Sequence, residues 1–295
     1  MNIALCANGT ILPGLHATLA SLVANANSPR TIQLYIFIEK IDEEELDALR
    51  TTITKSGGVG FIKFVPVTAS VFGNLRSLQG DYMTYMRLYL PEFIEDCDRL
   101  LYLDSDLVIT TDLSELYKTD LRGAIIGAAG VGVVRTALER PFFVKVGLSD
   151  DDRSFNGGVL LIDAKAWRKN HCTEKLLEFG HTHSADLVSA DQAILVANFS
   201  RLFFALPREY NINVAADSNL GDLKRGIYHF VGSPKPWDLF GSFIHRSYHI
   251  WGDLIGGSAF SEFRFIIKFW REHLRRAFII RRSYARVLLA RIKSK

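Results

Sequence analysis

Long hydrophobic runs are absent from this chain of 295 residues, since none reaches the ~18 apolar residues that a helix needs to cross a bilayer. No Lys or Arg precedes Arg30, so the N-terminus also lacks the charged region of a secretory signal. Cysteine is scarce: Cys6, Cys97 and Cys172 are far apart and odd in number, which fits neither a disulfide framework nor a zinc site. These absences predict a soluble or peripheral protein in a reducing compartment, which we expect to be the cytoplasm.

Several common catalytic motifs are missing as well. The chain has no Gly-x-x-x-x-Gly-Lys-Ser/Thr loop, no Gly-x-Ser-x-Gly elbow and no His-Glu-x-x-His helix. The segment Gly130-Val-Gly-Val-Val-Arg135 resembles the start of a dinucleotide-binding fingerprint, but Arg135 stands at the third glycine position and the segment lies mid-chain. The sequence therefore argues against a nicotinamide enzyme.

Apolar segments typical of strands alternate with segments of helical periodicity. We expect helices over residues 15–27, 42–56, 83–93, 112–117, 164–169, 173–182 and 190–198. Strands are expected over residues 1–7, 33–38, 60–67, 99–103, 124–129, 155–163, 201–206 and 226–231. This alternation predicts an α/β domain with a mostly parallel sheet, whose ligand would bind beyond the carboxyl ends of the strands.

The segment Arg99-Leu-Leu-Tyr-Leu-Asp-Ser-Asp106 delivers two carboxylates at the end of a buried strand. Residues i and i+2 of an extended segment point to the same side, so Asp104 and Asp106 can face one ligand. A hard cation such as Mg²⁺ or Mn²⁺ is bound by one or two carboxylates together with substrate phosphates. The pair therefore indicates a metal-bound nucleotide diphosphate; the alternative is an ordinary polar turn after a strand.

Other clusters along the chain could complete such a site. His229 could provide an imidazole ligand, Gly232 would allow a phosphate to approach the backbone, and Lys235 could neutralise its charge. Asn156 precedes two glycines, and Asp191-Gln192 opens a helix where both side chains could hold sugar hydroxyls. Each cluster also has a structural alternative: a core histidine, a glycine-rich turn, or a helix cap.

Taken together, these segments resemble the retaining glycosyltransferases of family 8, from Asn2 to about Trp251. The resemblance rests on six pieces in the family's order: the first strand, Thr84-Tyr-Met-Arg-Leu88, Leu101-Tyr-Leu-Asp-Ser-Asp106, Phe155-Asn-Gly-Gly-Val159, Asp191-Gln192, and His229-Phe-Val-Gly-Ser-Pro-Lys-Pro-Trp237.

The resemblance implies a GT-A catalytic domain over residues 1–255, with a Rossmann-like, mostly parallel sheet flanked by helices. It implies transfer of a galactose or glucose from a UDP-sugar to a glycan, such as a lipopolysaccharide core, with Mn²⁺ or Mg²⁺. The residues that it implies are Asp104, Asp106 and His229 as metal ligands; Gly232 and Lys235 at the diphosphate, with Ser105 also at the donor; Asn8 at the nucleoside; and Arg87, Asn156, Asp191 and Gln192 at the sugar. Asp191 and Gln192 would also lie where a catalytic nucleophile has to be. A same-face attack by the acceptor hydroxyl is nevertheless favoured, because the amide of Gln192 is a poor nucleophile.

Two positions depart from the family's pattern. Many members have an acid where this chain has Asn8, and another acid where it has Gly130-Val-Gly. The alternatives are another metal-dependent nucleotide-sugar enzyme, such as a nucleotidyltransferase or a sugar-nucleotide hydrolase, and an inactive glycan-binding relative. Residues 8–14 contain no Lys or Arg, which argues against a triphosphate-binding loop.

The C-terminal region is strongly basic. Residues 261–295 contain eleven Lys or Arg and two Glu, a balance of +9 in a chain of net charge +3, which leaves −6 for the rest. We therefore expect a basic amphipathic helical region over residues 256–295. Its apolar side chains, including Phe263, Trp270, Phe278 and Ile292, favour binding to the inner face of an anionic plasma membrane. The alternative is a helix packed on the body; nucleic-acid binding is not expected.

Overall fold

The computed structural model describes residues 1–73, 75, 77–78, 81–260 and 262–293. Its centre is a seven-stranded sheet with the strand order β10-β6-β9-β4-β1-β2-β3. The bounds of these strands are β1 (Asn2–Asn8), β2 (Gln33–Glu39), β3 (Phe61–Pro66), β4 (Arg99–Leu103), β6 (Ile126–Ala128), β9 (Val159–Asp163) and β10 (Phe204–Ala205). All neighbours are parallel except β9, which runs antiparallel to both β4 and β6. The prediction of a mostly parallel α/β sheet is confirmed.

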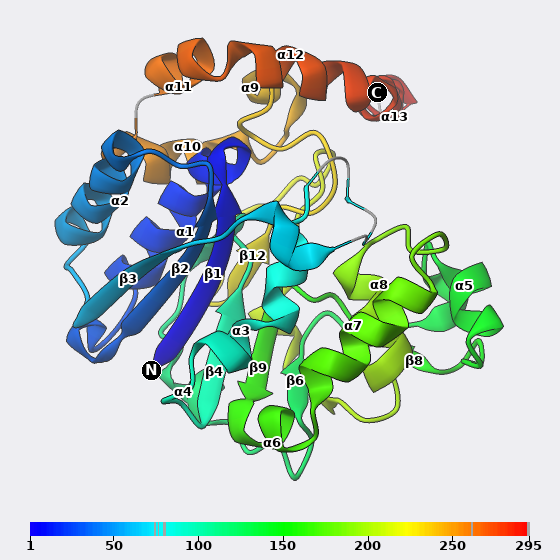
Figure 1. Cartoon of the computed structure of the whole chain (residues 1–295). Helices are drawn as coiled ribbons and strands as arrows, with labels where there is room; N and C mark the ends of the chain where they lie inside the picture. Colours follow the sequence, from blue (N-terminus) through cyan, green and yellow to red (C-terminus); the bar gives the residue numbers. More distant parts are fainter. Residues whose placement is uncertain (74, 76, 79–80, 261, 294–295) are drawn as a thin grey trace.

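Both faces of the central strands β1, β4 and β9 are buried, which explains why these strands read as continuous apolar runs. Along β1, Ile3 and Leu5 pack into a core with α1 (Leu12–Ala24) and α2 (Glu43–Lys55), whereas Ala4 and Cys6 pack into a second core. The second core also contains residues of α3 (Leu90–Phe93), α6 (Ala164–Lys169), α7 (Cys172–Thr182) and α8 (Asp191–Phe199). Figure 1 shows these helices on the two sides of the sheet.

Several boundaries differ from those expected. The helix predicted over residues 83–93 is a 3-10 helix, Met83–Leu88, followed by the separate short helix α3. Pro91 explains the break, because proline has no N–H and is tolerated only in the first turn of a helix. The strand expected over residues 155–163 begins only at Val159, since Asn156, Gly157 and Gly158 form a turn.

A second, three-stranded sheet has the order β11-β12-β5. Its strands are β5 (Leu107–Ile109), β11 (Ile212–Asn213) and β12 (Ile227–His229). Because β12 is antiparallel to β5, His229 is paired with Leu107, directly after Asp106. Two residues distant in the sequence are thereby brought to one place. The remaining small elements are α4 (Ser114–Lys118), α5 (Arg140–Lys145) and the pair β7 (Gly132–Val133) and β8 (Arg153–Ser154).

The C-terminal region folds as helices that pack on the body. They are α9 (Gly241–Ile244), α10 (Tyr248–Gly256), α11 (Glu262–Lys268), α12 (Trp270–Ile279) and α13 (Arg281–Lys293). In Figure 1, α11 and α12 lie across the top of the molecule, at the end toward which β1 runs. Lys268 pairs with Asp42 at 2.7 Å, and Arg276 pairs with the buried Asp238 at 2.5 Å. Within the described ranges, no helix combines the length and the hydropathy needed to cross a bilayer.

Candidate active site

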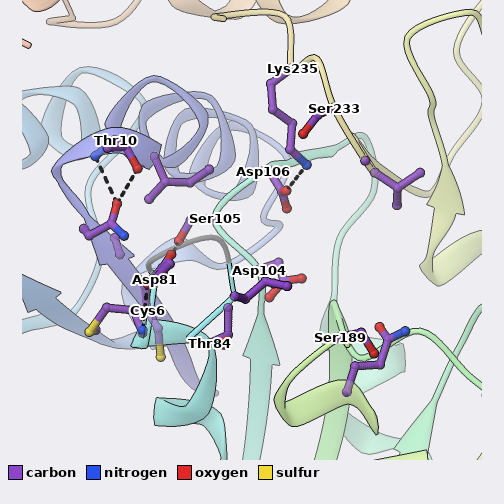
Figure 2. Close-up of a pocket in the computed structure, with 18 of the residues that line it drawn as sticks. Cys6, Thr10, Asp81, Thr84, Asp104, Ser105, Asp106, Ser189, Ser233 and Lys235 are labelled. Carbon is purple, nitrogen blue, oxygen red and sulfur yellow. Dashed lines mark hydrogen bonds and ion pairs between the residues drawn. The ribbon is translucent and has the colours of Figure 1, made fainter. Parts of the chain in front are cut away.

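A cavity of about 490 Å³ lies where β1 and β4 end. All eleven residues that the sequence predicts for the site line this cavity, although they come from six separate segments of the chain. They are Asn8, Arg87, Asp104, Ser105, Asp106, Asn156, Asp191, Gln192, His229, Gly232 and Lys235. The cavity is therefore the candidate active site, and Figure 2 shows part of its lining.

Asp104, Asp106 and His229 each direct one potential metal-ligand atom to a common point, and these atoms lie within 4.8 Å of one another. His229 Nε2 is 3.1 Å from Asp106 Oδ1 and 3.5 Å from Asp104 Oδ2. Within the described chain, the buried Oδ1 of Asp106 receives no well-aligned hydrogen bond. Two carboxylates and an imidazole facing one another in this way form a donor set that suits a divalent cation.

A chain of hydrogen bonds fixes the tautomer of His229. The amide N–H of Gly158 donates to Asn156 Oδ1, which also accepts from Asn211 Nδ2 at 2.9 Å. Asn211 Oδ1 is then an acceptor, so His229 Nδ1, 3.0 Å away, carries the proton. The lone pair of a neutral imidazole is consequently on Nε2, facing the two carboxylates. Asn211 was missed by the sequence analysis, because nothing in its local sequence signals this contact.

Gly158 makes this arrangement possible through close packing. A Cβ atom at this position would lie 2.3 Å from Cε1 of His229 and 2.9 Å from Oδ2 of Asp104. The carbonyl of Gly158 also accepts the amide N–H of Asp104 at 2.8 Å. Only a residue without a side chain leaves room for both groups, which gives a physical reason for the glycine directly before β9.

Lys235 lies at the second carboxylate. Its Nζ donates to Asp106 Oδ2 at 2.6 Å and to the carbonyl of Phe230, and Figure 2 shows the first of these bonds. Burial acts to raise the pKa of Asp106, but the positive charge of Lys235 opposes it, and this pKa is held well below its ordinary value. Asp106 is therefore ionised, with one oxygen bound to Lys235 and the other facing His229.

Arg87 connects the metal-ligand cluster to the start of α8. Its guanidinium is buried and pairs with Asp104 at 3.0 Å and with Asp191 at 2.6 Å. It also donates to the carbonyl of Gly157 at 2.7 Å. Burial lowers the pKa of Arg87, but Asp104 and Asp191 outweigh it and raise this pKa above its ordinary value. Burial raises the pKa of Asp191 to about 6, against the opposing effect of Arg87.

The other predicted residues have contacts that organise the cavity. Gln192 Oε1 accepts the amide N–H of Gly157 at 3.2 Å, and Ser105 Oγ donates to the carbonyl of Cys6 at 2.8 Å. Gly232 adopts a positive φ of 71° in the loop before Lys235. Asn8 accepts hydrogen bonds from Thr10. Their contacts to a donor substrate stay predictions.

The cavity also has lining residues that the sequence analysis did not identify. Asp81 lies beside Asn8. The tail contributes four residues of α12, which are Glu272, Arg275, Arg276 and Ile279. Contacts between such distant segments leave no signal in a single sequence, so the sequence analysis did not place the basic region at the cavity.

A Rossmann-like sheet with an Asp-x-Asp pair and a cavity beyond its strand ends defines the class of GT-A glycosyltransferases. The fold is similar to that of the galactosyltransferase LgtC crystallised with donor and acceptor sugar analogues, with a TM-score of 0.74 and 25% identity over 88% of this chain and 97% of LgtC. The fold of GlyE from Streptococcus pneumoniae is also similar, with a TM-score of 0.65 and 22% identity over 92% of this chain and 64% of GlyE.

The chain belongs to glycosyl transferase family 8, whose family model matches residues 2–240. General stress protein A of Bacillus subtilis is 26% identical over 81% of this chain and 87% of its own length. The glycosyltransferases GlyE and GlyF of Streptococcus pneumoniae are 25% and 27% identical, over 75% and 85% of this chain. The chain spans 53% and 60% of the lengths of GlyE and GlyF.

Proposed function

We propose that the protein transfers a hexose, galactose or glucose, from a UDP-sugar to a glycan acceptor, with retention of the anomeric configuration and with Mn²⁺ or Mg²⁺. The observation that carries this proposal is the convergence of Asp104, Asp106 and His229 in a cavity that also holds Lys235 and Asp191. A metal-bound sugar nucleotide requires metal ligands, a positive charge near its phosphates and polar side chains that can bind the sugar hydroxyls. Asp191 and Gln192 are the polar side chains meant here.

The residues of the chain have separate parts in this reaction. A bound divalent cation supplies Lewis-acid stabilisation of the charge that develops on the departing diphosphate. Lys235 lies next to Asp106 and can direct its remaining N–H toward the same diphosphate. Arg87 pairs with both Asp104 and Asp191. The metal ligand Asp104 and the proposed sugar-binding residue Asp191 are therefore held at a fixed distance from each other.

The surroundings of Asp191 and Gln192 favour same-face attack by the acceptor hydroxyl over a covalent intermediate. Asp191 is paired with Arg87, which makes its carboxylate a weak nucleophile. Gln192 is an amide whose oxygen is already bound to the N–H of Gly157. We therefore assign Asp191 and Gln192 to binding of the sugar and of the acceptor near the reacting carbon.

The proposal is tested with a panel of UDP-sugars and Mn²⁺, measuring UDP release and glycan product for the wild type and for Asp106→Asn. A matched control is Asp47→Asn, since Asp47 is exposed on α2. We expect UDP release for at least one donor, a loss of at least 100-fold in Asp106→Asn, and no change in the control. UDP release that needs no acceptor would instead support a hydrolase, and donor binding that ignores both metal and Asp106 would refute the site assignment.

We further infer that the acceptor is a membrane-associated glycan, such as a lipopolysaccharide core, and that the protein works at the inner face of the plasma membrane. The support is the exposure of large apolar side chains on α11 and α12, which are Ile267, Trp270, Leu274 and Phe278. Arg271 accompanies them, with its guanidinium carbon 5.4 Å from the centroid of the Trp270 ring. Apolar side chains with basic neighbours favour an anionic lipid interface.

Co-sedimentation with anionic vesicles tests this placement. The double variant Trp270→Ser/Phe278→Ser should bind the vesicles at least fivefold less than the wild type does. The control variant Leu138→Ser changes a leucine that is 85% exposed and lies outside the C-terminal helices, so it should bind as the wild type does. These substitutions are preferable to a truncation, because removal of α12 would also remove part of the cavity wall. Equal sedimentation of the wild type and the double variant would refute membrane binding through the tail.

A further inference from the structure

Glu139 is a buried carboxylate in the segment between β7 and β8, and it does not line the cavity. Its Oε1 accepts the backbone N–H of Val188 at 3.0 Å and that of Ser189 at 2.7 Å. Its Oε2 accepts the hydroxyl of Ser189. Burial of a carboxylate is costly unless hydrogen bonds replace the lost water. Because these three donors belong to one turn, Glu139 fixes the position of that turn.

The position of Glu139 is set by the body of the protein. Glu139 directly precedes α5, and its backbone carbonyl accepts the N–H of Phe143 at 3.0 Å. Phe142 and Phe143 of this helix are buried in the same hydrophobic core as Ile194 of α8. The carboxylate is therefore held by packing that does not depend on the turn to which it binds.

The turn held by Glu139 leads directly to the cavity. Ser189 lines the cavity, where Figure 2 labels it, and its carbonyl accepts the N–H of Gln192 at 3.1 Å. The next residue, Ala190, has φ 52° and ψ −121°, a conformation that favours glycine. Such strain persists only where the surrounding structure imposes it. Asp191 and Gln192 follow at once, so their direction into the cavity depends on the conformation of Ala190.

The start of α8 has no cap of its own. A helix usually begins at a Ser, Thr, Asn or Asp whose side chain accepts a backbone N–H. Ala190 occupies this N-cap position in α8, and it makes no such bond. Glu139 provides acceptors for the two residues before it instead, and its negative charge lies toward the N-terminal end of the helix, which the helix dipole favours.

We propose that Glu139 is a positioning residue of the reaction. By holding the turn of Val188 and Ser189, it maintains the strained backbone that directs Asp191 and Gln192 toward the sugar and the acceptor. The inference rests on the proposed function, because it concerns the two residues assigned there to these ligands. Asp106 and His229 have fixed partners of their own. Loss of Glu139 should therefore impair sugar recognition and turnover while leaving metal-dependent binding of UDP intact.

The first test compares Glu139→Ala with Glu139→Gln by isothermal titration of UDP, UDP-galactose and UDP-glucose, with Mn²⁺ present. Glu139→Ala should bind UDP as the wild type does, but it should lose about 10-fold in affinity for the UDP-hexose that the wild type uses. The rate of UDP release from that donor should fall by about 10- to 100-fold, the effect of misplaced substrate-binding groups. Equal losses for UDP and UDP-hexose, or no loss for either, would overturn the proposal.

Glu139→Gln should remain within about threefold of the wild type, because its amide oxygen can accept both N–H groups and its NH₂ can donate to the Ser189 hydroxyl. Glu139→Asp retains the charge, but its carboxylate is one methylene too short to reach all three donors. It should lose UDP-hexose affinity as Glu139→Ala does, so the comparison holds even if Glu139→Ala fails to fold. An aspartate variant that is more active than the glutamine variant would overturn the proposal.

A second substitution tests the mechanism independently. Glycine adopts the conformation of Ala190 without strain, so it needs less support from Glu139. The double variant Glu139→Ala/Ala190→Gly should therefore release UDP at least about fivefold faster than Glu139→Ala. A double variant as slow as the single one would refute a role of Glu139 through Ala190.

The matched control is Glu115→Ala, since the Glu115 side chain is 83% exposed on α4. It should change neither the affinities nor the rate of UDP release. A wild type that releases UDP normally beside unaffected Glu139 variants would refute this inference alone. A wild type without metal-dependent UDP binding would refute the proposed function itself.

Discussion

Replacement of Gly158 by alanine tests the packing around the metal-ligand cluster directly. The new Cβ would lie 2.3 Å from Cε1 and 2.6 Å from Nδ1 of His229, whereas ordinary contact begins near 3.4 Å. The ring would therefore have to move by about 1 Å, in an interior packed too densely to absorb the shift freely. His229 is 4% exposed and is held on β12 and by Asn211, so it has little room to move.

Two consequences follow from this displacement. Overpacking of this kind typically costs about 1–3 kcal/mol of the free energy of unfolding. Metal-ligand distances tolerate only about 0.2 Å, so a ring displaced by several times that amount should weaken Mn²⁺ binding by about 10- to 100-fold. Gly158→Ala should thus lower both the melting temperature and the affinity for Mn²⁺.

Calorimetric titration with Mn²⁺ and thermal unfolding of the same preparations measure both effects. Gly221→Ala is the matched control, because a Cβ at Gly221 would meet no atom within 4 Å. The control should behave as the wild type does. If Gly158→Ala matched the control in both melting temperature and Mn²⁺ affinity, the described packing of His229 against the turn before β9 would be refuted.

Three further predictions concern neighbouring residues. Asn211→Leu removes the acceptor of His229 Nδ1 and should weaken Mn²⁺ binding about 10-fold or more; a Kd within twofold of the wild type would contradict this. Ala190 has φ 52° and ψ −121°, a region suited to glycine, so Ala190→Gly should raise stability by up to about 1 kcal/mol in thermal unfolding, and a loss would contradict the strain. Because burial raises the pKa of Asp191 to about 6, the native state binds its proton more tightly than the unfolded chain does. The stability from this group is therefore lost as the pH rises from about 4 to about 6, and the melting temperature of the wild type relative to Asp191→Asn should fall over that window. A constant difference would exclude the pKa shift.

The sequence predicted most of the elements that deliver the site, because the signals were local. The apolar run ending in Asp104 and Asp106 is β4, and the apolar segment before Val231 contains β12. Each segment has its own periodicity and its own polar end, so its identity does not depend on distant parts of the chain. Residues drawn from such segments were found together in one cavity.

Features that depend on contacts between distant segments were not predictable in this way. Asn211 contacts His229 across eighteen residues, and Asp81 contacts Asn8 from a segment with weak periodicity. The helix predicted over residues 83–93 was wrong in type, since its apolar spacing also suits a 3-10 helix and Pro91 interrupts it. Side-chain pairing across elements is decided by the fold, and a single sequence carries little information about it.

The position of α12 has a thermodynamic consequence. One side of this helix supplies Glu272, Arg275 and Arg276 to the cavity wall, and its other side exposes Trp270 and Phe278. Suppose that a surface binds the exposed side of α12 and favours one position of this helix. Because α12 also forms part of the cavity wall, such binding must change the affinity of the cavity for its ligand. Linkage is reciprocal, so an occupied cavity must change the affinity for that surface by the same factor. The change in surface affinity caused by the donor ligand and the change in donor affinity caused by the surface would then both measure the same coupling free energy.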